Sequence, residues 1–145
     1  MENLMKALKN DKKLSDITVD EFTSPVSVFA DQDTSIPVIR ELMDENGIRH
    51  VPIIENGVAI GLITDRDLKV IVNINLYEEL FAKDIMIHNP FTVITGSTLE
   101  DVIFDMSENK LGSVLIEDSE GQCIGIFTYI DAMNALIEIL RGDDL

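Results

Sequence analysis

The sequence predicts an α+β fold, a mixed α/β architecture made of two copies of a strand-helix-strand-strand-helix unit. An internal repeat is the first observation: GLITDRDL at residues 61–68 is followed 64 positions later by GIFTYIDA at residues 125–132. The second observation is that short apolar runs and stretches with helical spacing alternate in the same order in both halves. With 145 residues, the chain can bury a substantial core as one compact domain.

In the first half, the run VSVF at residues 26–29 follows a proline and predicts a strand. A helix follows, with Thr34 or Ser35 as its N-terminal cap and Pro37 tolerated in its first turn. Gly47 suits the end of this helix, because glycine adopts the left-handed conformation without strain.

The second half repeats this order. Residues 91–94, FTVI, predict a strand, and Ser97 with Glu100 forms an S-x-x-E capping box for the next helix. That helix carries one apolar stripe at helical spacing, which is suited to packing against a sheet. The stripe consists of Leu99, Val102, Ile103 and Met106.

Each half also predicts a β-hairpin followed by a second helix. Two apolar runs lie on either side of a glycine-containing turn, and glycine supplies the positive φ that tight hairpins require. The runs and turns are VPII (51–54), ENG (55–57) and VAIGLIT (58–64), then SVLIE (113–117), DSEG (118–121) and QCIGIFT (122–128). Helical spacing resumes in DRDLKVIV and in YIDAMNALIEIL.

Segments outside the repeat complete the expected organisation. Leu4, Met5 and Leu8 have the spacing of an amphipathic N-terminal helix, and the segment between the halves is expected to be partly helical. The predicted boundaries are an N-terminal helix at 1–14, a first domain at 15–72, a linker at 73–86, a second domain at 87–140 and a tail at 141–145.

Charge and composition exclude several classes of partner. The net charge of −16 repels the phosphates of nucleic acids and anionic lipids. No segment reaches the roughly 18 apolar residues of a membrane span, and the N-terminus lacks the apolar stretch of a signal peptide. We therefore expect a cytoplasmic protein that binds neither nucleic acid nor membrane. The single Cys123 agrees with a reducing compartment.

Catalytic and metal chemistry find little support. The stretch GQCIG at residues 121–125 matches a nucleophile elbow with cysteine, but a strand follows where that turn requires a helix. DQDTSI at residues 31–36 begins like a calcium loop, yet Ile36 and Leu42 stand where glycine and the bidentate glutamate are needed. Two histidines and one cysteine are too few for a standard zinc site. We expect a protein that is not an enzyme.

The repeated motif has the chemistry to bind a ribose. A threonine at the end of each hairpin supplies a hydroxyl, and an aspartate three residues later supplies a carboxylate able to accept from two vicinal hydroxyls. The glycine three residues before each threonine has no side chain, so a flat ligand could approach the backbone there. A plain helix cap uses the same residue types, so each copy alone fits either interpretation. Two copies in register favour the binding site.

In these residues the chain resembles a tandem pair of CBS domains, named after cystathionine β-synthase and also called a Bateman module. The family signature G-h-x-[TS]-x-x-D is met at residues 61–67 and again at residues 125–131. The resemblance covers roughly residues 22–140. It implies two β-α-β-β-α repeats that pack through their sheets about a pseudo-twofold axis. It also implies two clefts between the repeats that bind AMP, ADP, ATP or S-adenosylmethionine.

The resemblance assigns roles residue by residue. Asp67 and Thr64 would hold the ribose in one cleft, and Asp131 and Thr128 would do so in the other. In one cleft the adenine would lie against Thr23 and the rest of residues 23–26, together with Ile48 and Val51. In the other it would lie against residues 89–92, together with Leu111 and Val114. Arg49, His50 and Arg66 are the candidates for phosphate contacts, although Arg49 and His50 also suit a solvated strand end. Their counterparts Gly112, Ser113 and Ile130 are uncharged, so the clefts should differ.

The sequence therefore predicts a regulatory CBS pair that binds adenine nucleotides and signals through a dimer or partner interface. No obligatory cofactor is expected, and Mg²⁺ could accompany the phosphates. The resemblance suggests a homodimer, and the effector protein is unknown. The alternative is a dimerisation or scaffolding module that is independent of nucleotides and has vestigial clefts.

Overall fold

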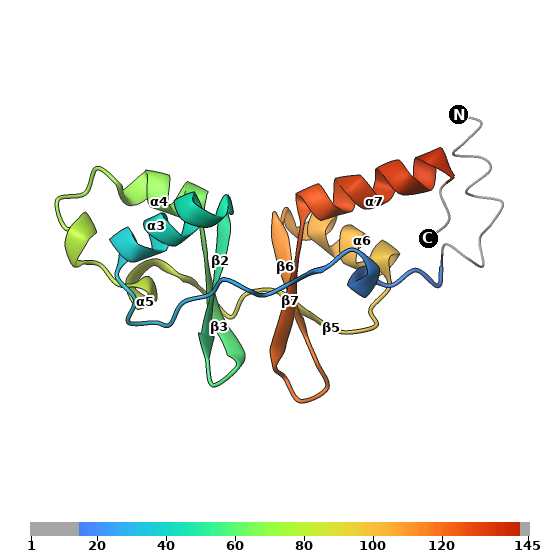
Figure 1. The fold of residues 1–145 in the computed structure, drawn as a ribbon, viewed down its shortest axis with the longest axis horizontal. Helices are drawn as coiled ribbons and strands as arrows, with labels where there is room; N and C mark the ends of the chain where they lie inside the picture. Colours follow the sequence, from blue (N-terminus) through green and yellow to red (C-terminus); the bar gives the residue numbers. More distant parts are fainter. Residues whose placement is uncertain (1–14, 143–145) are drawn as a thin grey trace. The chain divides into compact units, whose positions relative to one another are not determined.

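The computed structural model describes residues 15–142, which form two compact units. Within this range, unit 1 consists of residues 15–25, 92–119 and 124–142, and unit 2 consists of residues 26–91 and 120–123. Each unit combines a small β-sheet with helices (Figure 1). The predicted α+β class is confirmed, and the predicted N-terminal helix at 1–14 lies outside the described residues, as do the last three residues of the tail.

Unit 2 holds most of the first repeat. Its sheet has the order β2-β3-β4 and is antiparallel throughout, with a β-bulge in the β2–β3 ladder between Ile53 and Ile54. Helices α3 and α4 contribute Ile36, Ile39 and Leu68, all fully buried, to the core. The elements are α3 (Ile36–Asn46), β2 (His50–Glu55), β3 (Val58–Thr64), α4 (Asp65–Ile71), the 3-10 helix η2 (Tyr77–Glu79), α5 (Ala82–Ile85) and β4 (Ile87–His88).

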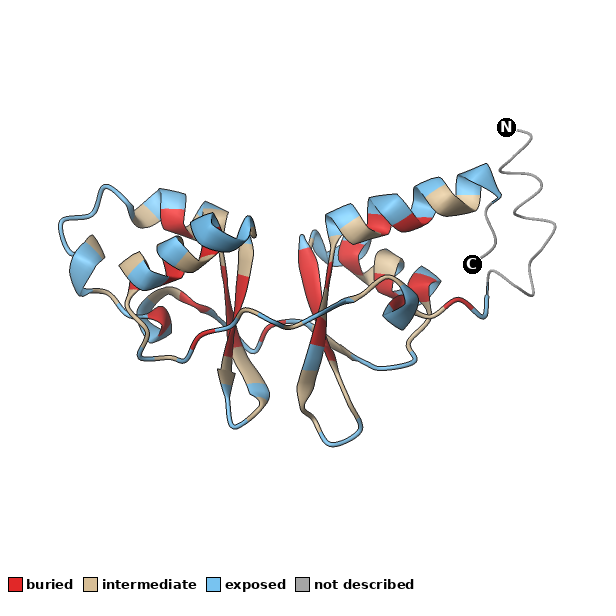
Figure 2. Ribbon diagram, in the orientation of Figure 1, coloured by how far each residue is buried: buried red, intermediate tan, exposed pale blue. Residues whose placement is uncertain are grey.

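Unit 1 holds most of the second repeat. Its sheet has the order β1-β7-β6-β5, in which β1 is antiparallel to β7 and β5 is parallel to β6. Val102, Val114 and Phe127 are buried in its core, and Figure 2 shows such buried residues in red on the strands and on one side of each long helix. The elements are the 3-10 helix η1 (Val19–Glu21), β1 (Ser24–Pro25), β5 (Thr92–Ile94), α6 (Leu99–Asn109), β6 (Ser113–Glu117), β7 (Cys123–Thr128) and α7 (Tyr129–Arg141).

The first predicted strand is wrong. Residues 26–29 are not in a strand, and the chain pairs with β2 only at Ala30. The Ala30 amide donates to the Pro52 carbonyl at 3.0 Å, and the Ala30 carbonyl accepts from the Ile54 amide at 2.9 Å. The β-branched and aromatic residues after Pro25 predicted a strand, but a strand needs a ladder of partners, and this segment pairs with β2 only at Ala30.

The helix caps differ from the expectation at one end. Ser35 is the N-cap of α3, and Gly47 ends that helix with φ of +62°, as predicted. The cap of α6 is Thr98 rather than Ser97, so the predicted capping box is wrong. Thr98 Oγ1 accepts from the Asp101 amide at 3.2 Å, whereas Ser97 Oγ donates to the Ile94 carbonyl at 2.6 Å.

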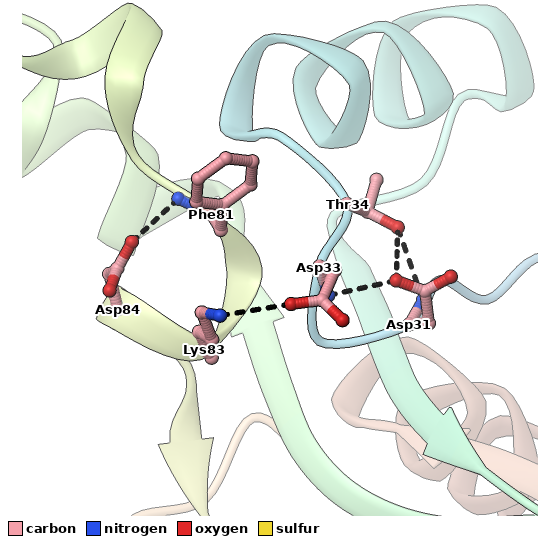
Figure 3. A network of polar contacts seen from close by, with 6 residues as sticks. All are labelled: Asp31, Asp33, Thr34, Phe81, Lys83 and Asp84. Carbon is pink, nitrogen blue, oxygen red and sulfur yellow. Dashed lines mark hydrogen bonds and ion pairs between the residues drawn. The ribbon is translucent and has the colours of Figure 1, made fainter.

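The segment predicted as a linker, residues 73–86, contains two short helices. Only η2 and the short α5 are helical there, and β4 then pairs with β3. The loop before α3 is tied to α5, because Lys83 Nζ donates to Asp33 Oδ1 at 3.0 Å (Figure 3). The Asp31 carboxylate accepts from the Asp33 amide and the Thr34 hydroxyl, so the acidic stretch that begins like a calcium loop forms a turn.

The compact units do not follow the sequence repeats. Strand β1 lies near the start of the first predicted domain, at 15–72, yet its partner is β7 of the second, with Ser24 opposite Ile126. Asp20 fixes the same segment, since its carboxylate accepts from Thr95 Oγ1 at 2.6 Å and from the Gly96 amide at 2.7 Å. Burial alone would raise the pKa of Asp20, but these hydrogen bonds outweigh it and lower the pKa below its ordinary value. Residues 15–25 therefore belong to the compact unit of the second repeat.

Candidate functional site

The first motif lies where β3 ends and α4 begins. Thr64 is the last residue of the strand and the N-cap of the helix, and Asp67 is the third helical residue. The Thr64 amide donates to Asp67 Oδ2 at 2.9 Å, and Thr64 Oγ1 accepts from the Asp67 amide at 3.3 Å. Both side chains are half-buried. The motif therefore forms a reciprocal helix cap, which uses only one of the two carboxylate oxygens.

The second motif has the same construction between β7 and α7. The Thr128 amide donates to Asp131 Oδ2 at 2.9 Å, and the Thr128 hydroxyl donates to the same oxygen at 3.2 Å. The Asp131 amide donates back to Thr128 Oγ1 at 3.5 Å. Both halves therefore place a half-buried carboxylate at the first turn of a helix, with Oδ1 outside the cap contacts.

The start of the preceding strand lies next to each motif. His50 is the direct cross-strand partner of Thr64, and the Asp65 amide donates to the Arg49 carbonyl at 2.9 Å. In the second repeat the Tyr129 amide donates to the Gly112 carbonyl at the same distance. Cross-strand partners share a face of the sheet, so the His50 and Thr64 side chains lie on one face. Arg49 and His50 therefore lie next to Thr64 and Asp67 within unit 2, a proximity that the sequence alone had left open.

The environment of His50 favours its neutral form. Burial lowers the pKa of His50, because the imidazolium loses solvation there. The carboxylates of Asp65 and Asp67 act in the opposite direction, and the Arg49 guanidinium adds to the lowering. The net pKa of His50 lies below its ordinary value, so the imidazole is neutral at pH 7.

The other predicted site residues differ in their exposure and in the unit to which they belong. Arg66 is exposed on α4, and Ile48 is half-buried against the core of unit 2. Val51 is fully buried in that core, so its side chain packs against the helices. Thr23 belongs to unit 1, where its hydroxyl donates to the Val19 carbonyl at 2.7 Å. Thr23 therefore groups with the second motif in this structure, whereas the resemblance assigned it with Ile48 and Val51.

Neighbouring side chains fill the space beside the motif glycines. A Cβ atom built on Gly61 would lie 2.4 Å from Met86 Sδ, and one on Gly125 would lie 2.4 Å from Thr23 Cγ2 and 3.2 Å from the Ser24 carbonyl oxygen. The two distances of 2.4 Å are too short for a real Cβ atom, and 3.2 Å is a tight contact. Close packing of β4 and β1 segments therefore accounts for both glycines without a ligand.

Sequence reasoning did not single out Ser113 as a site residue. It occupies the position equivalent to His50, is 6% exposed, and its Oγ is a buried side-chain atom without a hydrogen-bond partner among the described residues. Its neighbours in β6 indicate its direction: Val114 and Ile116 belong to the core of unit 1, so Ser113 faces the other side of the sheet. The alternation of side chains along β6 could have shown that Ser113 lies on the face opposite the core residues Val114 and Ile116.

Arg40 and Lys69 were also not predicted. They line a concavity of about 340 Å³ in unit 2 together with Arg49 and Asp65, next to the first motif. Within residues 15–142, no group of three or more His, Cys, Asp or Glu residues is arranged to hold a metal ion. A helix with the length and apolarity to cross a membrane is likewise absent from this range.

Comparison with known proteins agrees with the repeated fold. The family model described as CBS domain matches residues 16–73 and 82–138. A CBS domain-containing protein of Dictyostelium discoideum is 29% identical over 121 residues, which cover 75% of this chain and 83% of that protein. An inosine-5'-monophosphate dehydrogenase of Korarchaeum cryptofilum is 31% identical over 97 residues, which are 67% of this chain but only 20% of the enzyme.

Solved structures show the same architecture. CBSX2 in complex with AMP has a TM-score of 0.75 at 24% identity, and the match covers 85% of this chain and 98% of that one. The CBS domain pair of protein MJ0100, in complex with 5'-methylthioadenosine and S-adenosyl-L-methionine, has a TM-score of 0.73 at 23% identity. That match covers 82% of this chain and 98% of the other.

Proposed function

Since the chain belongs to the CBS domain family and carries two CBS domains in tandem, we propose that it is a regulatory module that binds an adenine-containing ligand. Asp67 and Asp131 would accept the ribose hydroxyls, each within its own repeat. The proposal concerns binding rather than catalysis, because the matched part of the dehydrogenase relative is only 20% of that enzyme.

One observation carries this proposal: both motifs hold an aspartate in the same reciprocal cap and leave Oδ1 outside it. A carboxylate oxygen accepts two hydrogen bonds, so the aspartate can cap its helix and still accept from a ribose. The cap fixes the rotamer before the ligand arrives, which reduces the entropy lost on binding. Two relatives of the same fold were solved with AMP or with adenosine-containing ligands, which supports the ligand class.

The two motifs should prefer different ligands. Arg66 belongs to the first motif and Arg49 lies just before its adjoining strand, so a phosphate would find positive charge there, and the neutral imidazole of His50 can donate a hydrogen bond. Gly112, Ser113 and Ile130 offer none at the equivalent positions. In an acidic protein, an unneutralised phosphate is repelled at a site without cations. We therefore assign nucleotides to the first motif and uncharged or less charged adenosine derivatives to the second.

Regulation requires an output from binding. A ligand shifts a conformational equilibrium only by its difference in affinity for the two states. We propose that the output passes through a homodimer, because α7 exposes a stripe of apolar residues. The stripe consists of Ile130, Met133, Ile137 and Leu140, which are 42–55% exposed and spaced along one side of the helix. The effector would then recognise one state of this dimer.

Calorimetric titration with AMP, ADP, ATP and S-adenosylmethionine tests the function. Thermal unfolding gives a second readout, because a ligand at 100 times its dissociation constant should stabilise the fold by about 2.7 kcal/mol. Asp67→Asn and Asp131→Asn should each remove one binding site and leave the other, because asparagine still accepts the capping bond but lacks the charge. Asp101→Asn is the matched control, since Asp101 holds the same position in α6 outside the motifs.

Two results would contradict the proposal. If the double variant of Asp67 and Asp131 bound as tightly as the parent, the ribose assignment would be wrong. If no adenine ligand bound the parent chain while light scattering still found dimers, the alternative of a dimerisation module with vestigial sites would be favoured instead.

A further inference from the structure

A second group of basic residues lies close to the first motif. The concavity of about 340 Å³ is bounded by the C-terminal half of α3, the loop that leads to β2, and α4. Arg40, Arg49 and Lys69 line it, and these are three of the seven lysines and arginines in the described part of the chain. A volume of this size is at the lower end of the range for small-molecule sites.

Acidic side chains share the concavity with these cations. Arg40 Nε lies 3.6 Å from Asp44 Oδ2, and Lys69 Nζ lies 3.5 Å from Asp65 Oδ2. Both pairs join residues four apart on one helix, and the basic side chains are 44% and 73% exposed. Exposed pairs of this kind contribute little to stability, so their cations can turn to a more highly charged anion at little cost.

The concavity also combines charge with an apolar floor. Met43 and Leu68 line it and are 4% and 0% exposed. Charged groups interact more strongly beside such low-dielectric surface than in open water. A guanidinium can pair with two oxygens of one phosphate, and the ammonium of Lys69 can follow as a mobile point charge.

We propose that this concavity binds a chain of phosphate groups and thereby gives the first repeat a preference for ATP or ADP over AMP. It is contiguous with the first motif, since Asp65 lines it and lies between Thr64 and Asp67 in the chain. The inference rests on the proposed function for the identity of the ligand as a nucleotide. The concavity itself would also take inorganic pyrophosphate.

Negative charges near the concavity oppose the binding of an anion. Asp44, Asp65 and the carbonyl end of α3 oppose any anion here, and the whole chain carries a net charge of −16. A single negative charge would gain little against them. Two or more charges on one ligand can engage Arg40 and Lys69 together, so the site should discriminate strongly by the number of phosphates.

Calorimetry in buffer without Mg²⁺, with ATP, AMP and inorganic pyrophosphate as separate probes, tests the proposal. The double variant Arg40→Gln and Lys69→Gln should bind ATP and pyrophosphate at least tenfold more weakly and AMP unchanged. The control is the double variant Lys83→Gln and Arg141→Gln, which removes one lysine and one arginine from exposed positions outside the concavity. Thermal unfolding of each variant verifies the fold.

The outcomes separate this proposal from the proposed function. Pyrophosphate binding that the Arg40 and Lys69 variant loses, without any adenine ligand binding, supports the anion site and contradicts the nucleotide function. Unchanged binding of ATP and pyrophosphate in that variant overturns the inference and leaves the ribose assignment intact. It is also overturned if the parent chain binds no pyrophosphate and binds AMP as tightly as ATP, or if the control variant loses as much affinity.

Discussion

His50 and Ser113 occupy equivalent strand positions beside the two motifs, and they show how the repeats have diverged. Each follows the strand alternation that buries its neighbour, Val51 or Val114, in the core and turns the polar side chain to the other face. His50 has neighbouring charges from Asp65, Asp67 and Arg49. Ser113 is more deeply buried, and its hydroxyl lacks a partner within the described residues. The protonation of His50 therefore depends on nearby charges, whereas the buried hydroxyl of Ser113 suits only an uncharged hydrogen-bonding partner.

The lowered pKa of His50 makes stability depend on pH. The unfolded chain binds a proton at His50 near pH 6.5, but the folded chain binds it only at lower pH. Stability therefore falls as the pH falls through about 6.5 toward the folded pKa, because the unfolded state takes up the proton first. We expect the urea midpoint to decrease between pH 7.5 and 5.5, and we expect His50→Gln to remove this part of the decrease.

His88→Gln is the control for this prediction, since His88 is exposed in β4. It should leave the pH dependence of the parent chain unchanged. The same decrease in the His50→Gln variant as in the parent chain would show that carboxylates, rather than His50, control stability in this range.

At the scale of elements, the motif strands are held by segments from elsewhere in the sequence. Strand β3 accepts β4 beside Gly61, and β7 accepts β1 beside Gly125. Each glycine faces one close side-chain atom and one atom that no rotamer moves. Beside Gly61 these are Met86 Sδ at 2.4 Å and Met86 Cβ at 3.1 Å, and beside Gly125 they are Thr23 Cγ2 at 2.4 Å and the Ser24 carbonyl oxygen at 3.2 Å. The same sequence motif thus meets similar packing constraints from different segments in the two repeats.

Gly125→Ala should destabilise the fold by about 1–3 kcal/mol, the range for overpacking, because the new methyl group meets Thr23 and backbone. Gly61→Ala should cost a similar amount, since Met86 Cβ would lie 3.1 Å from the new methyl group and does not move with the rotamer. Denaturant unfolding of the two variants measures both losses of stability. If these glycines serve instead to admit a ligand, alanine would reduce ligand binding and leave stability unchanged, which would contradict the packing explanation.

At the scale of the whole molecule, local pattern predicted the elements better than their partners. The hairpins and helices were predicted because their periodicity and turn glycines lie within a few residues. The pairing of β1 with β7 could not be predicted, because it joins residues about 100 positions apart and no local signal specifies it. Thr98 replaced Ser97 as a cap because adjacent residues of the same chemistry compete for that role.

In the candidate site, too, local proximity could be predicted from the sequence and long-range proximity could not. The motif residues and the strand start beside them are adjacent because the hairpin brings them together, and a hairpin can be read from sequence. Arg40 could not be assigned in this way, since it reaches the concavity through the packing of α3 near α4. Neither could the position of Thr23, which depends on the long-range β1 pairing.

The net charge and the stripe on α7 act in opposite directions on the proposed homodimer. Two copies that each carry −16 repel one another, while the apolar side chains of the stripe favour association. Salt screens the repulsion within a Debye length of about 10 Å at 0.1 M and leaves burial of apolar surface intact. The dimer should therefore tighten as NaCl is raised from 20 to 300 mM, unlike a dimer held by ion pairs.

Sedimentation equilibrium across this salt range measures the effect, and a matched pair of variants locates the interface. Ile137→Glu places a charge within the stripe and should weaken the dimer by at least tenfold. Ile124→Glu introduces the same change at a residue of β7 with nearly the same exposure, 43% against 42%, and should leave the dimer unchanged. Weaker association at high salt, or equal effects of the two variants, would mean that charged groups or another surface hold the copies together.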